Sequence, residues 1–430
     1  MLPALLIAAS LVAQVEASPP AELSPAVQRL LRKLDAPEVD ARNAAEEELI
    51  RIGPAVLDLL PANNPSPETR ARLARIRQHF ADKRAVEQLQ TGSAVTLSGT
   101  LALEEVRAEI EKQTGNKVAD YRQRFGQSVT NPQLKLELKN APFWPALDAV
   151  LDSAQLSIYS FSGDDGVAIA DRAAGERPRR DRGAYAGPLR IEATRLASER
   201  RPGSKDSATL AVNLEIAWEP RLKPIAFEQP MAQILAVDDQ GQELFVERPA
   251  QREERSLQVA APGGGTAVEM LLPFVAPPRS AATIASLKGT VTALLAGKVE
   301  AFKFEKLGDA AKPGFKPLAQ TIADTTVTLD SVRKNNDIWE VVIRVRYAGA
   351  GKSLAPNRGW ILQNDAFLTG ADSQRIDKAG SHSAPVSEDE FGLTYQFDLP
   401  EIDGCTFVYK TPSSIHSVPL EYELKNLPLP

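Results

Sequence analysis

The chain has 430 residues, of which 43% are hydrophobic and 25% charged, which excludes wholesale disorder and supplies a large core over roughly three domains. One Cys and three His exclude an intramolecular disulfide and any Cys-based zinc or iron–sulfur site, and leave little for His-based chemistry. The chain has 50 Lys and Arg against 56 Asp and Glu, a net charge of −6, so no global charge attracts nucleic acid.

The first residues are typical of a signal peptide. An apolar run from Leu2 to Val15 ends in small residues, and Val15-Glu16-Ala17 fits a cleavage site, so residues 1–17 are predicted to be removed after Ala17. The run is shorter than the roughly 20 residues of a membrane span, and no other stretch is long and apolar enough. Because the n-region lacks Lys and Arg, a buried N-terminal helix is the alternative. We expect an exported chain, periplasmic or extracellular, without a transmembrane span once processed.

Residues 24–90 are predicted to be helical. Apolar residues recur at helical spacing in Pro25–Leu34 and Val39–Ile52, Gly53-Pro54 interrupts the pattern, and Ser66 is expected to cap a long charged helix. The phrase "LDAPEVDARNAAEEELIRIGPAVLDLL" resembles a HEAT-type helical repeat. Only one or two units fit, fewer than the three or so of a free-standing solenoid, so a small helical module is expected.

Residues 94–171 change to a mixed pattern. A strand at Val95–Leu97 precedes a helix over Leu101–Gln113, which Gly115 is expected to end, and Lys117-Val118 could begin a return strand. The second half repeats this order: strand, helix, strand, turn and strand. There, apolar residues alternate at Leu134, Leu136 and Leu138, Asn140 is a candidate helix cap, and the last two strands carry Leu156, Ile158, Phe161, Val167 and Ile169.

The phrase "LKLELKNAPFWPALDAVLDSAQLSIYSFSGDDGVAIA" resembles the secretin and TonB short N-terminal domain. The likeness covers about 75 of the 430 residues and depends on the hydrophobic spacing and the Ala-Leu-Asp together. In that family the domain is a periplasmic protein-contact module, so the resemblance implies a βαβ-βαββ fold and contact-making. No secretin ring domain or TonB barrel follows, so it does not imply secretion or transport.

A segment rich in Arg, Gly and Pro, residues 172–187, is predicted to be a linker, and its arginines, Arg172 to Arg182, a solvated face. The remainder is predicted to be β. Strands are expected at Leu189–Arg195, Thr209–Trp218, Ile225–Val237 and Glu243–Glu247.

The β region is expected to form two β-sandwiches. "LKGTVTALLAGKVEAFKFEKL" and "CTFVYKTPSSIHSVPLEYELKNL" end in similar alternations, which indicates a repeat with a boundary near residue 310. The predicted fold class is therefore multidomain α+β, with a helical HEAT-like module, a small βαβ-βαββ domain and antiparallel sandwiches at 188–309 and 310–430. The whole arrangement resembles multidomain exported proteins of planctomycete-type bacteria.

The glycine-rich and acidic motifs do not predict a cofactor or metal site. Gly351-Lys352-Ser353 resembles the end of a phosphate-binding loop, but Arg346 stands where the first Gly is needed and Pro356 prevents the required helix. Gly263-Gly264-Gly265 lacks the strand–turn–helix setting of a dinucleotide site. Asp238-Asp239-Gln240-Gly241 and Gly163-Asp164-Asp165-Gly166 lack the spacing of a calcium loop and are interpreted as turns.

No catalytic residue is predicted either. Gly380-Ser381-His382-Ser383 is interpreted as a polar loop, His416 as an edge or loop residue of the last hairpin, and His79 as a solvated or interhelical residue. The large apolar side chains are expected in cores, although an adjacent aromatic pair on the second helix of 94–171 could instead form an exposed contact. The large side chains are Phe143, Trp144, Trp218, Trp339 and Trp360, and Cys405 is expected as a small core residue.

Three functions follow from this pattern. The first is a non-enzymatic exported protein that contacts an unknown envelope protein, because contact-type modules occur without a catalytic constellation. The second is a polysaccharide-binding module on one sandwich, which would need exposed aromatics such as Trp218 or Trp360, although aromatics are only 6% of the chain. The third is an enzyme that gathers Asp and Glu from distant loops around a cleft. Oligomeric state and partner are not predicted.

Overall fold

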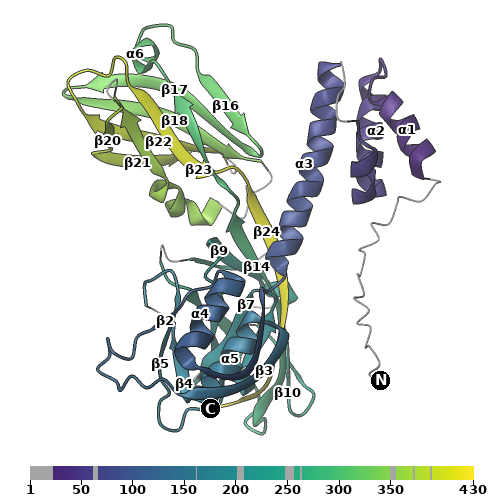
Figure 1. The fold of residues 1–430 in the computed structure, drawn as a ribbon, viewed down its shortest axis with the longest axis vertical. Coiled ribbons are helices and arrows are strands. Elements are labelled where there is room, and N and C mark those ends of the chain that lie inside the picture. The colour runs from purple at the N-terminus through teal and green to yellow at the C-terminus, as the bar shows by residue number, and fades with distance from the viewer. Residues whose placement is uncertain are drawn as a thin grey trace, which may run out of the picture. The chain divides into compact units, whose positions relative to one another are not determined.

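The computed structural model of the chain describes residues 23–61, 66–160, 162–200, 208–246, 256–261, 264–348, 355–370, 373–387 and 390–430 (Figure 1). The chain divides into two compact units, Met1–Ala85 and Val86–Pro430. The described part is mixed α and β with several antiparallel sheets. The predicted signal peptide, residues 1–17, lies outside the described residues.

The first unit is helical, as predicted. Helix α1 (Leu23–Lys33) packs on α2 (Val39–Ile52), a 3₁₀ turn η1 (Pro54–Leu59) follows, and α3 (Pro67–Gln90) begins in this unit. The predicted bounds of α2 are confirmed, and Ser66 Oγ accepts a hydrogen bond from Thr69 N at 3.4 Å as an N-cap does. Arg42 donates to the carbonyls of Ala36 and Pro37 at 2.6 and 2.7 Å, which fixes the turn between α1 and α2.

The small domain at the start of the second unit has the predicted order of elements. It contains β1 (Ala94–Ala102), α4 (Leu103–Thr114), β2 (Val118–Asp120), β3 (Gln133–Pro142), α5 (Phe143–Ala154), β4 (Leu156–Tyr159) and β5 (Val167–Asp171). Strands β1 and β3 pair antiparallel, whereas β5 pairs parallel with β2 and antiparallel with β4. Gly115 ends α4 at φ +73°, the left-handed conformation expected of a C′ glycine.

Asn140 is not the cap of α5, contrary to prediction. It lies inside β3 at φ +47°, and its backbone N–H donates to Thr96 Oγ1 at 3.0 Å. Helix α5 begins at Phe143, whose N–H donates to the carbonyl of Ser93 at 2.7 Å. The neighbouring strand segment, rather than a side chain, therefore satisfies the first donor of the helix.

The small domain is joined to the sandwich that follows by buried polar contacts. Trp144 is 1% exposed and donates through Nε1 to the carbonyl of Pro188 at 2.9 Å, so this side chain fills a core as predicted. The carboxylate of Glu219, also buried, accepts from Ser93 N at 2.8 Å and Asn116 Nδ2 at 3.2 Å. Both contacts bridge elements far apart in sequence.

The first sandwich is built from two antiparallel sheets around one core. One sheet has the order β13-β8-β7-β6 and contains β6 (Gly183–Ala186), β7 (Leu189–Arg200), β8 (Ala208–Trp218) and β13 (Ala267–Val275). The other contains β9 (Pro224–Pro230), β10 (Leu235–Asp238), β11 (Glu243–Leu244), β12 (Ser256–Ala260), β14 (Thr283–Ala296) and β24 (Ile415–Pro428). The strand predicted over Ile225–Val237 is interrupted by the 3₁₀ turn η3 (Met231–Gln233).

The second sandwich follows the same plan. One sheet contains β15 (Val299–Phe304), β19 (Asp365–Thr369), β20 (Arg375–Asp377) and β23 (Thr406–Pro412). The other contains β16 (Leu318–Ile322), β17 (Thr325–Asn335), β18 (Ile338–Tyr347), β21 (Gly380–Pro385) and β22 (Glu390–Asp398). Two short helical segments, α6 (Leu307–Ala310) and η5 (Ala355–Gln363), pack on its core.

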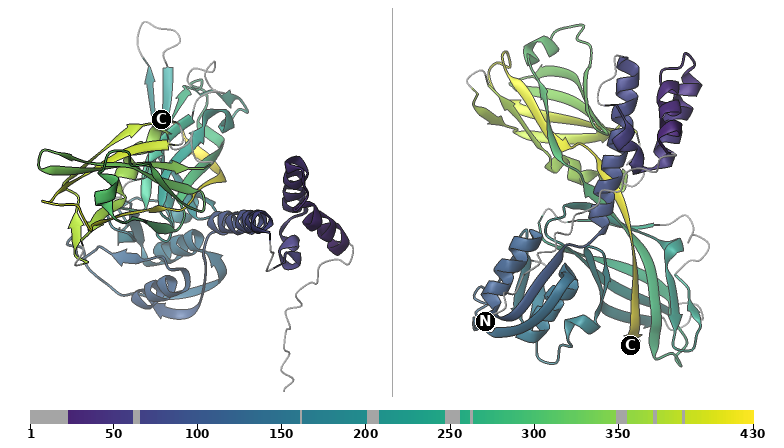
Figure 2. Two further views of the ribbon diagram at one scale, coloured as in Figure 1. Left: turned by 90° about the horizontal axis from the view of Figure 1, so that it is seen from above. Right: turned by 45° about the vertical axis from the view of Figure 1, so that its right-hand side comes forward.

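The predicted boundary at residue 310 is wrong, because β24 returns to the first sandwich. It pairs with β14 from Thr283↔Pro428 to Ala296↔Ile415, while β15 pairs with β23 of the second sandwich. Figures 1 and 2 show β24 as a long strand that runs from the second sandwich into the first. The second sandwich is thus inserted between β14 and β24. Alternation in residues 415–428 predicted a half-buried strand but not the sheet that it joins.

Candidate functional site

A buried ionic cluster lies between α5 and the edge of the first sandwich. Asp148 of α5 is 0% exposed and accepts from Arg179 Nε at 2.8 Å, Arg190 Nε at 2.7 Å and Tyr185 OH at 2.8 Å. Glu192 of β7 accepts from Arg190 Nη1 at 2.5 Å. We call these five residues the ionic cluster. It ties the small domain to β6 and β7.

The charges of Asp148, Arg190 and Glu192 compensate one another, whereas burial and the neighbouring Arg190 lower the pKa of Arg179. Burial alone would raise the pKa of Asp148, but the guanidinium groups of Arg190 and Arg179 hold it below its usual range. Burial would lower the pKa of Arg190, yet Asp148 and Glu192 raise it above its ordinary value. Burial and the proximity of Asp148 raise the pKa of Tyr185, so its hydroxyl stays protonated and donates. The cluster thus holds an ionised carboxylate and a protonated hydroxyl at the contact between α5 and strands β6 and β7.

The interpretation of Arg172 to Arg182 as a solvated face is wrong for three of the arginines. Arg179 lies in the 3₁₀ turn η2 (Arg179–Asp181) and is buried against Asp148. Arg172 pairs with Asp152, and Arg182 pairs with Glu176 at 2.8 Å and Glu192 at 3.1 Å. The segment 172–187 also contributes β6 to a sheet, so much of the predicted linker is an ordered wall of the domain junction.

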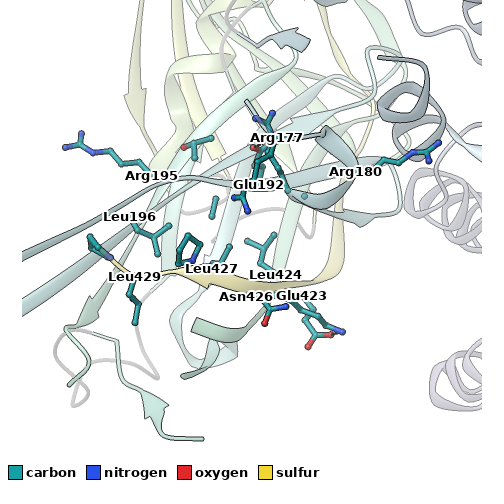
Figure 3. A pocket seen from close by; sticks show the side chains of 17 residues that line it. Arg177, Arg180, Glu192, Arg195, Leu196, Glu423, Leu424, Asn426, Leu427 and Leu429 are labelled. Atoms are coloured by element: carbon teal, nitrogen blue, oxygen red, sulfur yellow. Dashed lines mark ion pairs between the residues drawn. The ribbon is translucent and has the colours of Figure 1, made fainter. Parts of the chain in front are cut away.

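A groove of about 500 Å³ opens beside the ionic cluster (Figure 3). It is lined by Arg177, Arg180, Arg182 and Gly183, by Glu192–Leu196 of β7, and by Glu423–Pro430 at the end of the chain. Sequence reasoning missed this groove, because its walls are more than 200 residues apart in the chain and no motif links them.

Two strand edges border the groove. β6 pairs with β7 only over Leu189–Glu192, so Ala193–Arg200 pair with β8 alone among the described residues. β24 pairs with β14 along one side and has no described strand on the other, where β6 and β7 lie nearby. Backbone N–H and C=O groups of such edges are free to pair with an added strand. A bulge at Thr194, between Ala193 and Arg195, marks the point where the β6 pairing has ended.

The charge of the groove differs from that of the chain. Its lining side chains include five basic and two acidic residues, a net charge of +3, in a chain whose net charge is −6. Both acidic side chains have partners: Glu192 pairs with Arg190 and Arg182, and Glu423 with Lys288 and Lys425. The surplus charge is therefore positive.

A second hollow of about 600 Å³ adjoins the groove and shares Arg177, Arg182 and Glu192–Thr194 with it. It reaches Ser157–Ser160 at β4, the edge strand of its sheet. Burial, together with the nearby Glu192, raises the pKa of Glu215 in this hollow. Four carboxylates line this hollow: Glu192 and Glu176 are bound by arginines, whereas Asp171 and Glu215 have no ion pair among the described residues.

The structure places the predicted glycine-rich and acidic motifs as follows. Gly351-Lys352-Ser353 and Gly263 lie outside the described residues. Asp238 Oδ1 accepts from the N–H groups of Gln240 and Gln242 at 2.9 and 2.8 Å, which confirms a turn. Asp164 and Asp165 are exposed beside Gly163, which has the φ of +74° that favours glycine, so this motif is a turn as well.

The histidines are scattered. His382 lies in strand β21, paired with Thr394, rather than in the predicted loop, and His79 is exposed on α3 as predicted. His416 lies in β24, and its Nε2 is 3.0 Å from Ser414 Oγ, a pair that sequence reasoning did not single out. Within the described residues no carboxylate contacts His416.

Trp218 and Trp360, the aromatics that a polysaccharide site would use, line the same hollow of about 260 Å³, but neither side chain is exposed. Trp218 is 3% exposed, as predicted for a core residue, and Trp360 lies half-buried in η5 with its Nε1 enclosed. Exposed aromatics occur at Phe245 of the first sandwich, which is 50% exposed, and on the small domain. There Phe125 and Tyr159, 42% and 43% exposed, stack edge to face with ring centroids 5.0 Å apart.

Within the described ranges, no group of three or more His, Cys, Asp or Glu side chains is arranged to hold a metal ion. Across those same ranges, none of the helices combines the length and hydropathy of a membrane span. Cys405 is buried in the second sandwich as predicted.

No family model matches the chain, and neither the curated proteins nor the solved structures contain a significant match to it.

Proposed function

We propose that this chain is a non-enzymatic, exported protein of the cell envelope that binds an extended segment of a partner protein in the groove. The observation that carries the proposal is the pair of strand edges that border the groove: β7 from Ala193 to Arg200, of which Ala193–Leu196 line the groove, and the outer side of β24, of which Glu423–Pro428 line it. A segment laid along either edge gains main-chain hydrogen bonds of the kind used in β-augmentation.

Further surface features support contact-making. The small domain, whose sequence resembles a protein-contact module, exposes Phe125 and Tyr159 and leaves β4 as an edge strand. Exposed aromatics together with an open edge are typical of interaction surfaces. The carboxylate of Asp148 beside the groove is held ionised by two arginines, which favours a structural role for the ionic cluster.

Export is tested by the N-terminus of the protein. We expect the chain recovered from the envelope or medium of its host to begin at Ser18, because Val15-Glu16-Ala17 supplies the small residues that a signal peptidase recognises. Intact-mass measurement and N-terminal sequencing of the secreted fraction check this. Recovery of a chain that retains residues 1–17 and remains in the cytoplasm would contradict export and favour the buried-helix alternative.

Partner binding is tested by photo-crosslinking inside the native envelope. Benzoylphenylalanine at Leu196, a groove residue, is expected to form adducts whose crosslinked peptide comes from one extended segment of one partner. The matched control places the same group at Val386, which is 51% exposed on the second sandwich. Adducts that are equal at both positions, or absent at Leu196, would refute the groove as the contact site.

A further inference from the structure

We propose that the groove selects an acidic extended peptide, in which carboxylate side chains alternate with apolar ones. This inference rests on the proposed function, since it specifies the segment that the groove receives. Its two supports are a basic rim and an apolar floor that lie on different sides of the same groove.

The basic rim consists of Arg177, Arg180 and Arg195. All three side chains are exposed, and their guanidinium groups have no ion pair or hydrogen bond among the described residues. The contrast with their neighbours is sharp: Arg172, Arg179, Arg182 and Arg190 are each bound to a carboxylate. The rim therefore holds positive charge that the chain itself does not neutralise.

The apolar floor consists of Leu196, Leu424, Leu427 and Leu429. Leu196 and Leu429 are half-buried and present part of their hydrocarbon to the groove, whereas Leu424 and Leu427 are buried in the core of the first sandwich and close the groove from beneath. Successive side chains of an extended peptide point to opposite sides. A strand in the groove can therefore turn one set of side chains toward the leucines and the other toward the arginines.

The spacing of the rim indicates a linear ligand. Figure 3 shows the guanidinium groups of Arg195, Arg177 and Arg180 well separated from one another rather than converging on one point. A single phosphate or sulfate would be held by converging donors, often in bidentate geometry. Separated cations suit carboxylates spaced along a chain, and the bordering strand edges favour a polypeptide over an acidic polysaccharide.

The test uses peptides of about eight residues, the length of β7 that lacks a second neighbour. Fluorescence anisotropy with the intact mature chain compares alternating glutamate–valine, threonine–valine and lysine–valine peptides. We expect the glutamate peptide to bind at least about tenfold more tightly than the threonine peptide, and its affinity to fall with added salt. Amide hydrogen exchange should slow over Ala193–Arg200 or over β24 when the peptide is bound.

Two further arms test the rim and the backbone pairing. The triple variant Arg177→Gln, Arg180→Gln and Arg195→Gln should remove the preference for the glutamate peptide. The control variant has the same net charge, because it carries three Arg→Gln substitutions at exposed positions elsewhere, and it should keep the preference. Its substitutions are at Arg29, Arg32 and Arg346. Two glutamate peptides, each N-methylated on every second residue but in opposite registers, test the backbone pairing. The peptide whose methylated nitrogens face the strand edge should lose binding, because those nitrogens can no longer donate hydrogen bonds to it.

The possible failures are distinguishable. Equal binding of the glutamate and threonine peptides, both with protection of β7 or β24, would overturn the acidic selectivity and leave the groove as a general strand acceptor. No binding by any peptide would overturn the proposed function as well. Polygalacturonate that binds more tightly than the glutamate peptide, with loss in the triple variant, would overturn the peptide assignment in favour of a polysaccharide.

Discussion

Removal of residues 415–430 is expected to unfold the first sandwich while the second sandwich stays folded. Strand β24 supplies five buried side chains to the first core: Val418, Leu420, Tyr422, Leu424 and Leu427. At about 1.5–3 kcal/mol for each buried side chain, their loss costs about 8–15 kcal/mol, comparable with the entire stability of a domain. Circular dichroism melting and binding of a hydrophobic dye should show one cooperative transition lost and apolar surface exposed.

The truncated chain has an internal control, because β24 can be returned as a separate molecule. A synthetic peptide of residues 415–430 should restore the lost transition, whereas a peptide with Leu420, Tyr422 and Leu424 replaced by serine should not, since those side chains face the core. If the truncated chain melts like the intact one, β24 is not an essential strand of the first sandwich and its pairing with β14 does not describe the protein.

Asp148→Asn is expected to lower the free energy of unfolding by about 3–5 kcal/mol, the usual cost of removing one partner from a buried ion pair. The asparagine keeps the shape of the side chain but leaves the buried guanidinium groups of Arg179 and Arg190 without their shared carboxylate. Urea unfolding monitored by tryptophan fluorescence checks this. The matched control is Asp309→Asn, which breaks an exposed ion pair with Lys312 and should leave the unfolding midpoint unchanged.

The pH dependence of the same variant follows from the lowered pKa of Asp148. A carboxylate whose pKa is lower in the folded than in the unfolded chain stabilises the fold fully above its unfolded value of about 3.9, and the contribution is lost as pH falls toward the folded value. The difference in stability between the natural chain and Asp148→Asn should therefore be constant near neutral pH and shrink below about pH 4. A difference that grows in acid would contradict a paired, ionised Asp148.

Local structure was predictable where neighbouring residues determine it. The bounds of α2, the C′ role of Gly115 and the turn at Asp238 follow from periodicity and turn chemistry within a few residues, and the structure confirms them. The cap at Asn140 was wrong because the competing partner, Ser93, comes from a strand segment 50 residues earlier. The sheet that β24 joins was not predictable either. Alternating apolar residues show that one face of a strand is buried, but not which neighbour covers that face.

The candidate site was not predictable from the sequence for a related reason. A run of arginines separated by acidic residues is typically solvated, and nothing in residues 172–182 distinguishes the buried Arg179 from the exposed Arg177 and Arg180. Arg179 is buried because it pairs with Asp148, which lies on another element, the helix α5. Asp148 is itself buried only because α5 is apolar. The groove likewise exists only once β24 has crossed back to face β7.

The inserted second sandwich has a mechanical consequence. Two neighbouring chain segments, one between β14 and β15 and one between β23 and β24, connect it to the first sandwich. They hydrogen-bond to each other: the Gly297 N–H donates to the carbonyl of Ser414 at 2.9 Å, and the Ser413 N–H donates to the carbonyl of Lys298 at 2.8 Å. A pulling force applied between Val86 and the C-terminus acts on the β14–β24 ladder before any load reaches the insertion. The second sandwich is thus sheltered from tension until β24 shears away, and the groove, formed in part by that same strand, would open first.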